Sequence, residues 1–233
     1  MKHIPRFFIA GEISSDFDER LSPEQMFHAT KVLRLKEGDK VRIFNSISGE
    51  WECLIKNIKK NIISPLKLIR ESCEEPGPNI ACAIINPNRF STMIEKITEL
   101  GVKNIYPVIS DYTQYKTFNK QKVEQIIIQA CEQSKRLTIP KIHEITGLRE
   151  FLGNFSKNQR VLVGVEKEDT TKIMQCLDKN VMFLVGPEGG FSEEEISLFQ
   201  CNTAVSSFRF GQNILRSETA AIAFVSLWVA MYG

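Results

Sequence analysis

Two glycine-containing segments near the C-terminus carry the residues best suited to binding a ligand. In the first, the apolar run from Val181 to Val185 meets GPEGG, from Gly186 to Gly190, through which neither a helix nor a strand can continue. In the second, a strand-like run from Val205 to Phe210 ends at Gly211 and leads into the segment NILRSETA. Glycine exposes backbone N–H and C=O groups to close approach. Each segment therefore predicts a backbone-lined loop.

The flanking elements have to hold these loops in place. Ser192 and Glu195 have the spacing of a capping box, so a helix is expected to begin directly after the first loop. Turns that follow parallel strands meet at the carboxyl edge of a sheet, where open α/β folds bind ligands, so we expect the two loops to face one another. The alternative for the first loop is an ordinary connection from strand to helix. No GxxxxGK[ST] pattern occurs and GPEGG is not GxGxxG, so the usual phosphate-binding loops are not indicated.

Composition excludes several classes of protein. The 233 residues are 42% hydrophobic and 25% charged, which is ordinary for a soluble chain with one large or two modest domains. No apolar run approaches the roughly 18–20 residues that span a bilayer, and the N-terminus lacks a signal-peptide pattern, so we expect a cytoplasmic protein without membrane contact. The six cysteines form no CxxC pair and the three histidines form no ligand cluster. The sequence therefore predicts small buried thiols and no metal site.

Positive charge is concentrated in the N-terminal third. The net charge of the chain is only +2, but the segment from His28 to Arg70 contains ten Lys and Arg residues against four acidic ones. Such a local excess suits contacts with phosphates, as in RNA binding. The alternative is a solvated charged face.

The first part of the chain has the pattern of a small β barrel with one helix. Ser22, Pro23 and Gln25 mark a helix start, and the helix is expected to run to about Val32. The acidic, proline-containing stretch from Glu71 to Asn79 has no periodicity and marks a domain boundary. The strands of this part are expected at Pro5–Ala10, Lys40–Asn45, Glu50–Ile58 and Ile62–Ile69.

Strands and helices alternate beyond the boundary, which predicts a parallel sheet covered by helices. The last helix, from Glu218 to Met231, is apolar nearly all round and has to be covered on every side, either by its own domain or by a second copy of the chain. The other helices are expected around Phe90–Leu100, Val123–Ser134 and Thr170–Leu177. The strands are expected at Ile80–Ile85, Asn104–Ile109, Val161–Val165, Val181–Val185 and Val205–Phe210.

The amino-acid sequences of the two loops resemble those of a known family. LVGPEGGF, followed about twenty residues later by ILRSETA, is similar to the SPOUT-class RNA methyltransferases, in particular the family that methylates N3 of a uridine in 16S ribosomal RNA. The segments HATKVLRLKEGD, ITELGV and ACEQSKR are also similar, so the resemblance covers essentially the whole chain and is strongest in the last fifty residues.

The resemblance implies an architecture and an activity. It implies a small PUA-like RNA-binding β-barrel domain at residues 1–73, followed at residues 74–233 by an α/β SPOUT methyltransferase domain whose parallel sheet ends in a trefoil knot. The implied reaction uses S-adenosylmethionine to methylate 16S ribosomal RNA within the small subunit. The implied oligomer is a homodimer formed through the C-terminal domain.

Candidate site residues follow from the same resemblance. For the cofactor they are Gly164, Val165, Glu166, Leu184, Gly186, Glu188, Gly189, Gly190, Gly211, Ile214, Leu215 and Thr219. For RNA they are Arg6, His28, Lys31, Arg34, Gln133 and Arg136, although Arg34 could instead lie over the barrel as a surface arginine.

Arg216 and Glu218 are the candidate catalytic residues. Uridine N3 has to lose a weakly acidic proton before it becomes a useful nucleophile, and a guanidinium can stabilise the resulting uracil anion or an adjacent phosphate. The alternative for Arg216 is a salt bridge with Glu218 or Glu188. Glu218 is a candidate base, and proton loss to water is the alternative.

Two segments depart from the family pattern. Asp111-Tyr112-Thr113 replaces an arginine-serine pair, which removes one expected phosphate contact, and Phe210 replaces the leucine that precedes the second glycine loop. Two other functions stay open, namely ribose 2′-O methylation of RNA and RNA binding by a ribosome assembly factor without catalytic activity. Intact glycine loops and Arg216 favour the methyltransferase.

Overall fold

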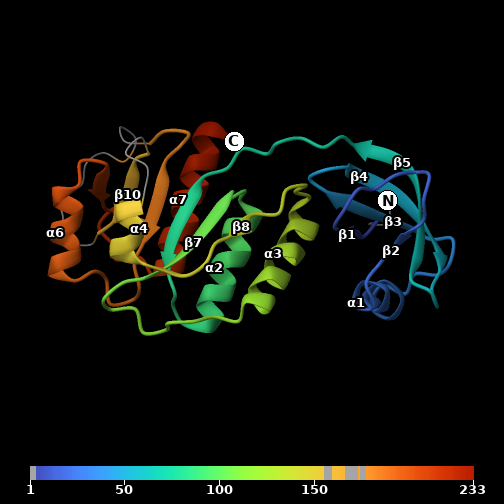
Figure 1. The fold of residues 1–233 in the computed structure, drawn as a ribbon, viewed down its shortest axis with the longest axis horizontal. Helices are drawn as coiled ribbons and strands as arrows, with labels where there is room; N and C mark the ends of the chain where they lie inside the picture. The colour runs from blue at the N-terminus through green and yellow to red at the C-terminus, as the bar shows by residue number, and fades with distance from the viewer. Residues whose placement is uncertain (1–3, 155–158, 166–172, 174–176) are drawn as a thin grey trace. The chain divides into compact units, whose positions relative to one another are not determined.

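The chain forms two compact units, each built around its own sheet. The computed structural model describes residues 4–154, 159–165, 173 and 177–233. The first unit comprises Met1–Glu75 and Cys131–Ile139, and the second comprises Pro76–Ala130 and Pro140–Gly233 (Figure 1). Because Cys131–Ile139 returns to the first unit, the division is not a single cut in the sequence.

The sheet of the first unit is an open half-barrel. Its strands lie in the order β1 (Arg6–Phe8), β3 (Lys40–Asn45), β4 (Gly49–Asn57), β5 (Ile62–Arg70) and β2 (Glu19–Arg20). The β1–β3 pair is parallel and the other pairs are antiparallel. Register shifts between β4 and β5 add local twist. The strands β1, β3, β4 and β5 were expected from the sequence and β2 was not, and among the described residues β1 and β2 are the two edges of this sheet.

The predicted N-terminal helix is present, but its second half is a π-helix and not an α-helix. Ser22 and Gln25 form the capping box of α1 (Pro23–Phe27), and the chain continues as the π-helix η1 (His28–Val32). Thr30 Oγ1 donates to the carbonyl of Met26 at 2.8 Å, a side-chain bond of the kind that competes with the regular helical ladder. The predicted end at Val32 is confirmed.

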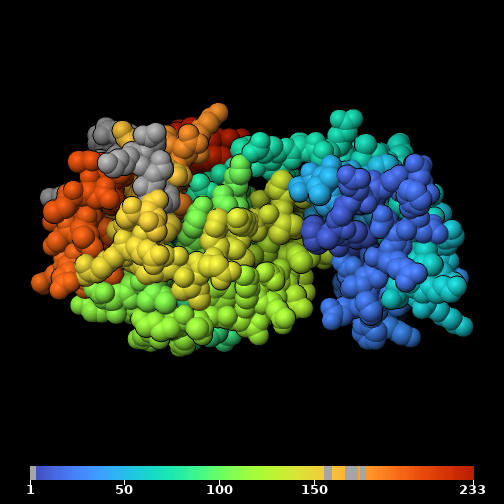
Figure 2. Space-filling view, in the orientation of Figure 1, coloured from blue at the N-terminus to red at the C-terminus, as the bar shows by residue number. Residues whose placement is uncertain are grey.

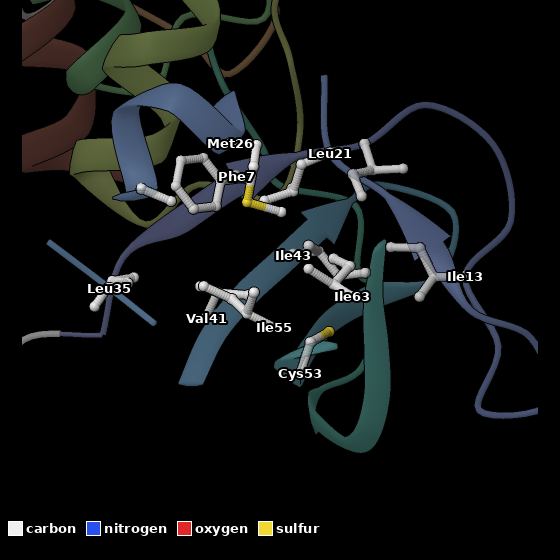
Figure 3. Packing of buried hydrophobic residues seen from close by; sticks show 12 residues of the cluster. Phe7, Ile13, Leu21, Met26, Leu35, Val41, Ile43, Cys53, Ile55 and Ile63 are labelled. Atoms are coloured by element: carbon white, nitrogen blue, oxygen red, sulfur yellow. The ribbon is translucent and has the colours of Figure 1, made fainter. Parts of the chain in front are cut away.

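A compact apolar core holds the first unit together. Ile43, Ile55 and Ile63 come from three neighbouring strands and are at most 1% exposed. Figure 3 shows Phe7 of β1 and Met26 of α1 next to one another above these residues. The helix is therefore fixed to the sheet by its apolar face, and its other face is left to solvent.

Arg6 ties β1 to the segment Cys131–Ile139 within the first unit. It is 6% exposed, and its Nε donates to Glu50 Oε1 at 3.1 Å. Its Nη1 donates to the carbonyls of Cys131 and Glu132, and its Nη2 donates to the carbonyl of Arg136, at 2.9–3.0 Å. One guanidinium thus joins a strand to the end of a helix more than 120 residues away in the chain.

The second unit contains the predicted parallel α/β sheet. All its strand pairs are parallel, and the order is β12-β10-β11-β6-β7-β8, with β9 also paired to β7. Its strands are β6 (Asn79–Ala83), β7 (Asn104–Ile109), β8 (Lys141–Ile142), β9 (Thr146–Gly147), β10 (Val161–Gly164), β11 (Met182–Val185) and β12 (Val205–Phe208).

Helices alternate with these strands as the sequence predicts. They are α2 (Pro87–Glu99), α3 (Lys120–Ser134), α4 (Leu148–Asn154), α6 (Glu193–Cys201) and α7 (Ser217–Tyr232). The short elements β2, β8, β9 and α4 were not predicted. The helix expected at Thr170–Leu177 lies almost wholly outside the described residues. The trefoil knot stays a prediction.

β11 shows how the sheet is covered on both faces. Met182 belongs to the same buried cluster as Phe151 of α4 and Phe199 of α6. The next residue, Phe183, stacks on Phe224 of α7 with ring centroids 4.6 Å apart. Because successive strand side chains point to opposite faces, α4 and α6 cover one face and α7 covers the other. Figure 2 shows α6, in orange, at the surface of this unit.

Within the described part of the chain, no helix is long and apolar enough to cross a membrane.

Replacing Arg6 should strongly destabilise the first unit. We expect Arg6→Ala to lower the free energy of unfolding by roughly 3–5 kcal/mol, because it removes one partner of a buried ion pair and three donors to buried carbonyls. Urea titration followed by tryptophan fluorescence, to which Trp51 of β4 contributes, measures this change.

Arg20→Ala is the matched control, since Arg20 is exposed on β2 of the same sheet. An equal decrease in the free energy of unfolding in the two variants would show that the buried contacts of Arg6 contribute little to stability.

Candidate functional site

Three loops meet over the carboxyl ends of neighbouring strands in the second unit. β10 lies between β12 and β11, so the loops after these strands are adjacent. Together with the turn after β7 they enclose a cavity of about 320 Å³. The two glycine loops singled out in the sequence do meet, but the loop after β10 separates their strands. Gly164 and Val165, from the segment Val163 to Glu166 that was a third loop candidate in the sequence, line the cavity between the two glycine loops, and Glu166 lies outside the described residues.

The first glycine loop depends on the absence of side chains. A Cβ on Gly186 would lie 2.8 Å from a ring atom of Phe191, which is closer than such contacts occur. Gly190 has φ +72°, in the left-handed region that glycine adopts without strain, and its N–H donates to the carbonyl of Pro187 at 3.0 Å. The loop thus forms a tight turn with bare backbone on the side of the cavity.

Glu195 fixes this loop to the turn after β7. It is 1% exposed, its Oε2 accepts from Ser192 N at 3.0 Å, and Ser192 Oγ accepts from Glu195 N at 3.2 Å, which confirms the predicted capping box. Its other oxygen, Oε1, accepts from Asp111 N at 2.9 Å. Asp111 Oδ2 in turn accepts from Ser192 Oγ at 2.5 Å. One buried carboxylate therefore holds two walls of the cavity together.

The turn after β7 is closed by its own hydrogen bonds. Thr113 N donates to the carbonyl of Ser110 at 3.1 Å, and Ser110 N donates to Thr113 Oγ1 at 2.9 Å. Thr113 is 3% exposed, whereas Tyr112 between these anchors is 52% exposed and lines the cavity.

Most predicted cofactor residues reach the cavity. Leu184 is fully buried inside β11, and Glu188, Gly211 and Thr219 do not belong to the lining. Glu166 lies outside the described residues. The predicted residues that line the cavity are Gly164, Val165, Gly186, Gly189, Gly190, Ile214 and Leu215.

Arg216 is free of the salt bridge considered from the sequence. It is the N-cap of α7, is exposed, and stands between Leu215 and Ser217, which both line the cavity. Among the described residues neither candidate carboxylate pairs with it. Instead, Arg89 Nη1 lies 3.8 Å from Glu188 Oε1, and Arg89 Nε lies 3.9 Å from Glu218 Oε1.

Glu218 has a carboxylate oxygen available inside the protein. Its side chain is 14% exposed, and Oε2 is buried without a hydrogen-bond partner among the described residues. The position of Glu218 in the first turn of α7 places this acceptor one helical residue past Ser217, a residue of the cavity lining.

Sequence reasoning missed several residues of the cavity. Phe210 was noted only as a departure, yet it lines the cavity and packs on Phe208 and Phe224 with centroids 5.0 Å apart. Arg209 also lines it, and donates to the carbonyl of Gln212. These residues lie within two positions of Gly211, so extending the second glycine loop by two residues would have found them. Tyr112 carries no such signal because it follows a different strand.

The predicted RNA contacts divide into exposed and buried residues. His28, Lys31 and Arg34 are exposed on η1 or just after it, and Gln133 is exposed near the end of α3. Arg34 has φ +58°, which turns the chain after the π-helix.

Arg6 and Arg136 do not present a free guanidinium to RNA. They are 6% and 7% exposed, and burial lowers the pKa of each, although the charge of Glu50 opposes this at Arg6 and that of Glu75 at Arg136. The carboxylate of Glu75 also accepts from Thr138 Oγ1 at 2.6 Å. Their burial argues for a structural role in place of the predicted RNA contact.

Some of the cysteines are buried thiols, as predicted, and others are exposed. Cys53, Cys82 and Cys131 are fully buried, and burial raises the pKa of Cys82 to about 12. Cys73 and Cys201 are exposed, and Cys176 lies outside the described residues. In the described part of the chain, no three His, Cys, Asp or Glu residues form a possible metal cluster.

Replacing Glu195 should loosen the turn after β7. Glutamine keeps the shape of Glu195 but can accept only one of its two backbone bonds, so we expect Glu195→Gln to lower the free energy of unfolding by roughly 1–3 kcal/mol. It should also speed hydrogen exchange at the Asp111 amide. Urea titration and exchange mass spectrometry measure the two effects.

Glu194→Gln is the control, because this neighbouring carboxylate is 79% exposed and pairs with Arg149 at 2.7 Å on the surface. If the Asp111 amide exchanges hydrogen at the same rate in both variants, Glu195 does not hold the turn after β7 in place.

Comparison with known proteins agrees with this geometry. The profile of an RNA methyltransferase domain matches residues 74–229, and that of an RNA methyltransferase PUA domain matches residues 21–64. A Legionella pneumophila putative methyltransferase, solved in complex with S-adenosylmethionine, is 29% identical with a TM-score of 0.87 over 98% of both chains.

Two proteins named ribosomal RNA small subunit methyltransferase E are similar over nearly their full lengths. The Rickettsia conorii protein is 32% identical over 95% of this chain and 93% of its own. The Neisseria gonorrhoeae protein, solved bound to S-adenosylmethionine, is 26% identical with a TM-score of 0.85 over 99% of both chains. With its two domain profiles, its fold and its glycine loops in agreement, the chain belongs to the ribosomal RNA small subunit methyltransferase E family.

Proposed function

We propose that this protein transfers a methyl group from S-adenosylmethionine to N3 of a uridine in 16S ribosomal RNA of the small subunit. The observation that carries the proposal is the cavity formed by the loops after β10, β11 and β12, in a chain whose relatives of the same fold are solved with S-adenosylmethionine. The choice of N3 rests on the resemblance of the LVGPEGGF and ILRSETA segments to the uridine-N3 enzymes.

The cavity suits the cofactor in size and lining. Its volume of about 320 Å³ is within the range of small-molecule sites. Apolar side chains of Val165, Ile214 and Leu215 offer contacts to an adenine ring, and the bare backbone of Gly186 and Gly190 offers N–H and C=O groups to its edge. We assign to these residues, with Gly164 and Gly189, the binding of S-adenosylmethionine.

The remaining chemistry needs positioning and charge stabilisation. The cofactor supplies a methyl group on a sulfonium, so the reaction is a direct displacement that the protein promotes by orienting donor and acceptor and by excluding water. The capping box at Ser192 and Glu195 keeps the loop wall rigid. Because N3 of a paired uridine is inside the helix, the target has to be single-stranded or flipped out.

Arg216 and Glu218 are the residues to which we assign the proton chemistry. Arg216 is exposed beside the cavity and has no carboxylate partner among the described residues, so its guanidinium can stabilise charge on the uracil carbonyl oxygens. Glu218, the neighbour of Ser217 in the lining, is assigned as the acceptor for the N3 proton because its Oε2 has no hydrogen-bond partner among the described residues, with proton loss to water as the alternative. Arg89 Nε lies 3.9 Å from the other oxygen of Glu218, an electrostatic contact that favours the ionised carboxylate.

RNA binding is assigned to residues outside the cavity. We propose that residues 1–73 form the RNA-binding domain and residues 74–233 the methyltransferase domain of a cytoplasmic enzyme. His28, Lys31, Arg34 and Gln133 are exposed and suited to phosphate or base contacts. Arg6 and Arg136 are omitted because they are buried.

We also propose that the enzyme is a homodimer through α7. Phe224, Val225 and Trp228 face the core of the second unit and are at most 2% exposed. The rest of this helix is almost as apolar but only partly covered, with Leu227 half-buried and Met231 48% exposed. A second copy would cover this face.

Nucleoside mass spectrometry tests the activity. Small subunits lacking the modification are incubated with the protein and labelled S-adenosylmethionine, and the RNA is digested to nucleosides. We expect label in 3-methyluridine. Arg216→Ala should lower the rate about 100-fold with the dissociation constant of the donor unchanged, as for other losses of a charge-stabilising donor.

Arg160→Ala is the matched control, because Arg160 is an exposed arginine that precedes β10 at the opposite edge of the sheet. Label in a 2′-O-methyl nucleoside would overturn the substrate atom. Absence of donor binding in a calorimetric titration would favour an assembly factor without catalytic activity. A rate in Arg216→Ala equal to that in Arg160→Ala would remove Arg216 from the mechanism.

Sedimentation equilibrium tests the dimer. We expect twice the 26.6 kDa mass of the chain for the wild type and for Leu198→Glu, which alters an exposed leucine on α6. Leu227→Glu should give the monomer mass, because it places a charge in the proposed interface. A wild-type protein of 26.6 kDa at micromolar concentration would reject the proposal.

A further inference from the structure

Tyr112 has the properties of an aromatic side chain held ready for a ligand. It lines the cavity, and half of its side chain, 52%, is exposed there. In the described part of the chain, no aromatic ring packs on it and its hydroxyl has no hydrogen-bond partner. The reaction chemistry described above does not use it.

The backbone that carries Tyr112 is fixed on both sides. Asp111 N donates to the buried Glu195 carboxylate, and Thr113 is buried and bonded to Ser110. Ordering a mobile loop on binding would cost conformational entropy, and here that ordering is already present in the free protein. An exposed ring on so rigid a turn is suited to recognition.

The ring lies over bare backbone of the first glycine loop. The Cβ and Cγ atoms of Tyr112 are 3.2 and 3.8 Å from the point where a Cβ on Gly189 would stand. A side chain at position 189 would therefore press on Tyr112. Because residue 189 is a glycine, the Tyr112 ring can lie close to the loop, and the outer part of the ring stays exposed.

Its strand of origin sets Tyr112 apart from the three loops to which donor binding is assigned. The loops to which donor binding is assigned follow β12, β10 and β11, whereas Tyr112 follows β7, two strands beyond β11 in the order β11-β6-β7. The turn after β7 reaches back to Gly189 of the first glycine loop, so Tyr112 stands at the border of the donor loops and lines the same cavity. A base brought to the donor loses its stacking partners in the RNA, and an aromatic side chain can replace them.

We propose that Tyr112 is the stacking platform for the target base, which it holds at the mouth of the cavity beside Gly189. The inference rests on the proposed methyl transfer to a uridine. It makes Tyr112 a substrate-contacting residue that determines affinity for an unstacked pyrimidine, while donor binding remains with the glycine loops.

Three substitutions separate the ring from its bulk and its hydroxyl. Tyr112→Phe keeps the ring, Tyr112→Leu keeps apolar bulk without a π face, and Tyr112→Ala removes both. Tyr115→Leu is the matched control, because Tyr115 is in the same connection after β7 but does not line the cavity. Thermal melting monitors the folding of each variant.

Two assays measure the effect. Steady-state transfer to unmodified small subunits gives kcat and KM for the RNA, and fluorescence anisotropy gives the affinity for a single-stranded uridine oligonucleotide in the presence of S-adenosylhomocysteine. We expect Tyr112→Leu and Tyr112→Ala to weaken oligonucleotide binding and kcat/KM about 5-fold to 100-fold, as for loss of one stacked base. Tyr112→Phe and Tyr115→Leu should behave as the wild type, with the dissociation constant for S-adenosylmethionine within twofold throughout.

Other results would overturn the platform. Wild-type oligonucleotide affinity in Tyr112→Leu would exclude stacking on the ring, and an equal loss in Tyr115→Leu would reduce the effect to disturbance of the loop. Weaker S-adenosylmethionine binding in Tyr112→Leu would place the ring against the donor. If the wild type transfers no methyl group, the proposed function fails, and the anisotropy measurement still decides whether Tyr112 holds the base.

Discussion

The site depends on a single buried carboxylate that serves two segments at once. Glu195 satisfies the Ser192 amide at the start of α6 and the Asp111 amide in the turn after β7, at 3.0 and 2.9 Å. A buried amide without an acceptor is costly, so both segments are held to one geometry. The first glycine loop and the turn that carries Tyr112 therefore behave as one rigid wall.

The order of the strands decides which loops share the cavity. β10 pairs with β12 on one side and with β11 on the other, although β10 precedes both in the chain. The loops after all three strands are thereby adjacent at the carboxyl edge. The strands of the two glycine loops are thereby two strand widths apart, about 10 Å, and the residues that follow β10 line the cavity between them.

Local signals in the sequence predicted elements well, whereas long-range contacts were not predictable. Capping boxes at Ser22 and Ser192 and alternating runs such as Lys40–Asn45 located helices and strands because they act within a few residues. The role of Arg6 depends on carbonyls more than 120 residues away, and that of Glu195 includes Asp111, 84 residues away. No periodic pattern in the sequence indicates contacts between residues so far apart in the chain. For the same reason Arg6 was predicted as an RNA contact, and the structure shows it buried.

The distribution of ion pairs refines where RNA can bind the first unit. Of the basic residues counted between His28 and Arg70, Arg42 and Arg70 surround Glu50, and Lys40 pairs with Glu52 at 2.7 Å. Three of the ten basic side chains of this segment are therefore paired within the sheet. Among the described residues no carboxylate pairs with Lys31 or Arg34, and Phe27 and Val32 beside them are 61% and 59% exposed. Free cations next to an exposed aromatic ring combine phosphate attraction with a surface for stacking, so η1 and its flanks are the part of this unit best suited to single-stranded RNA.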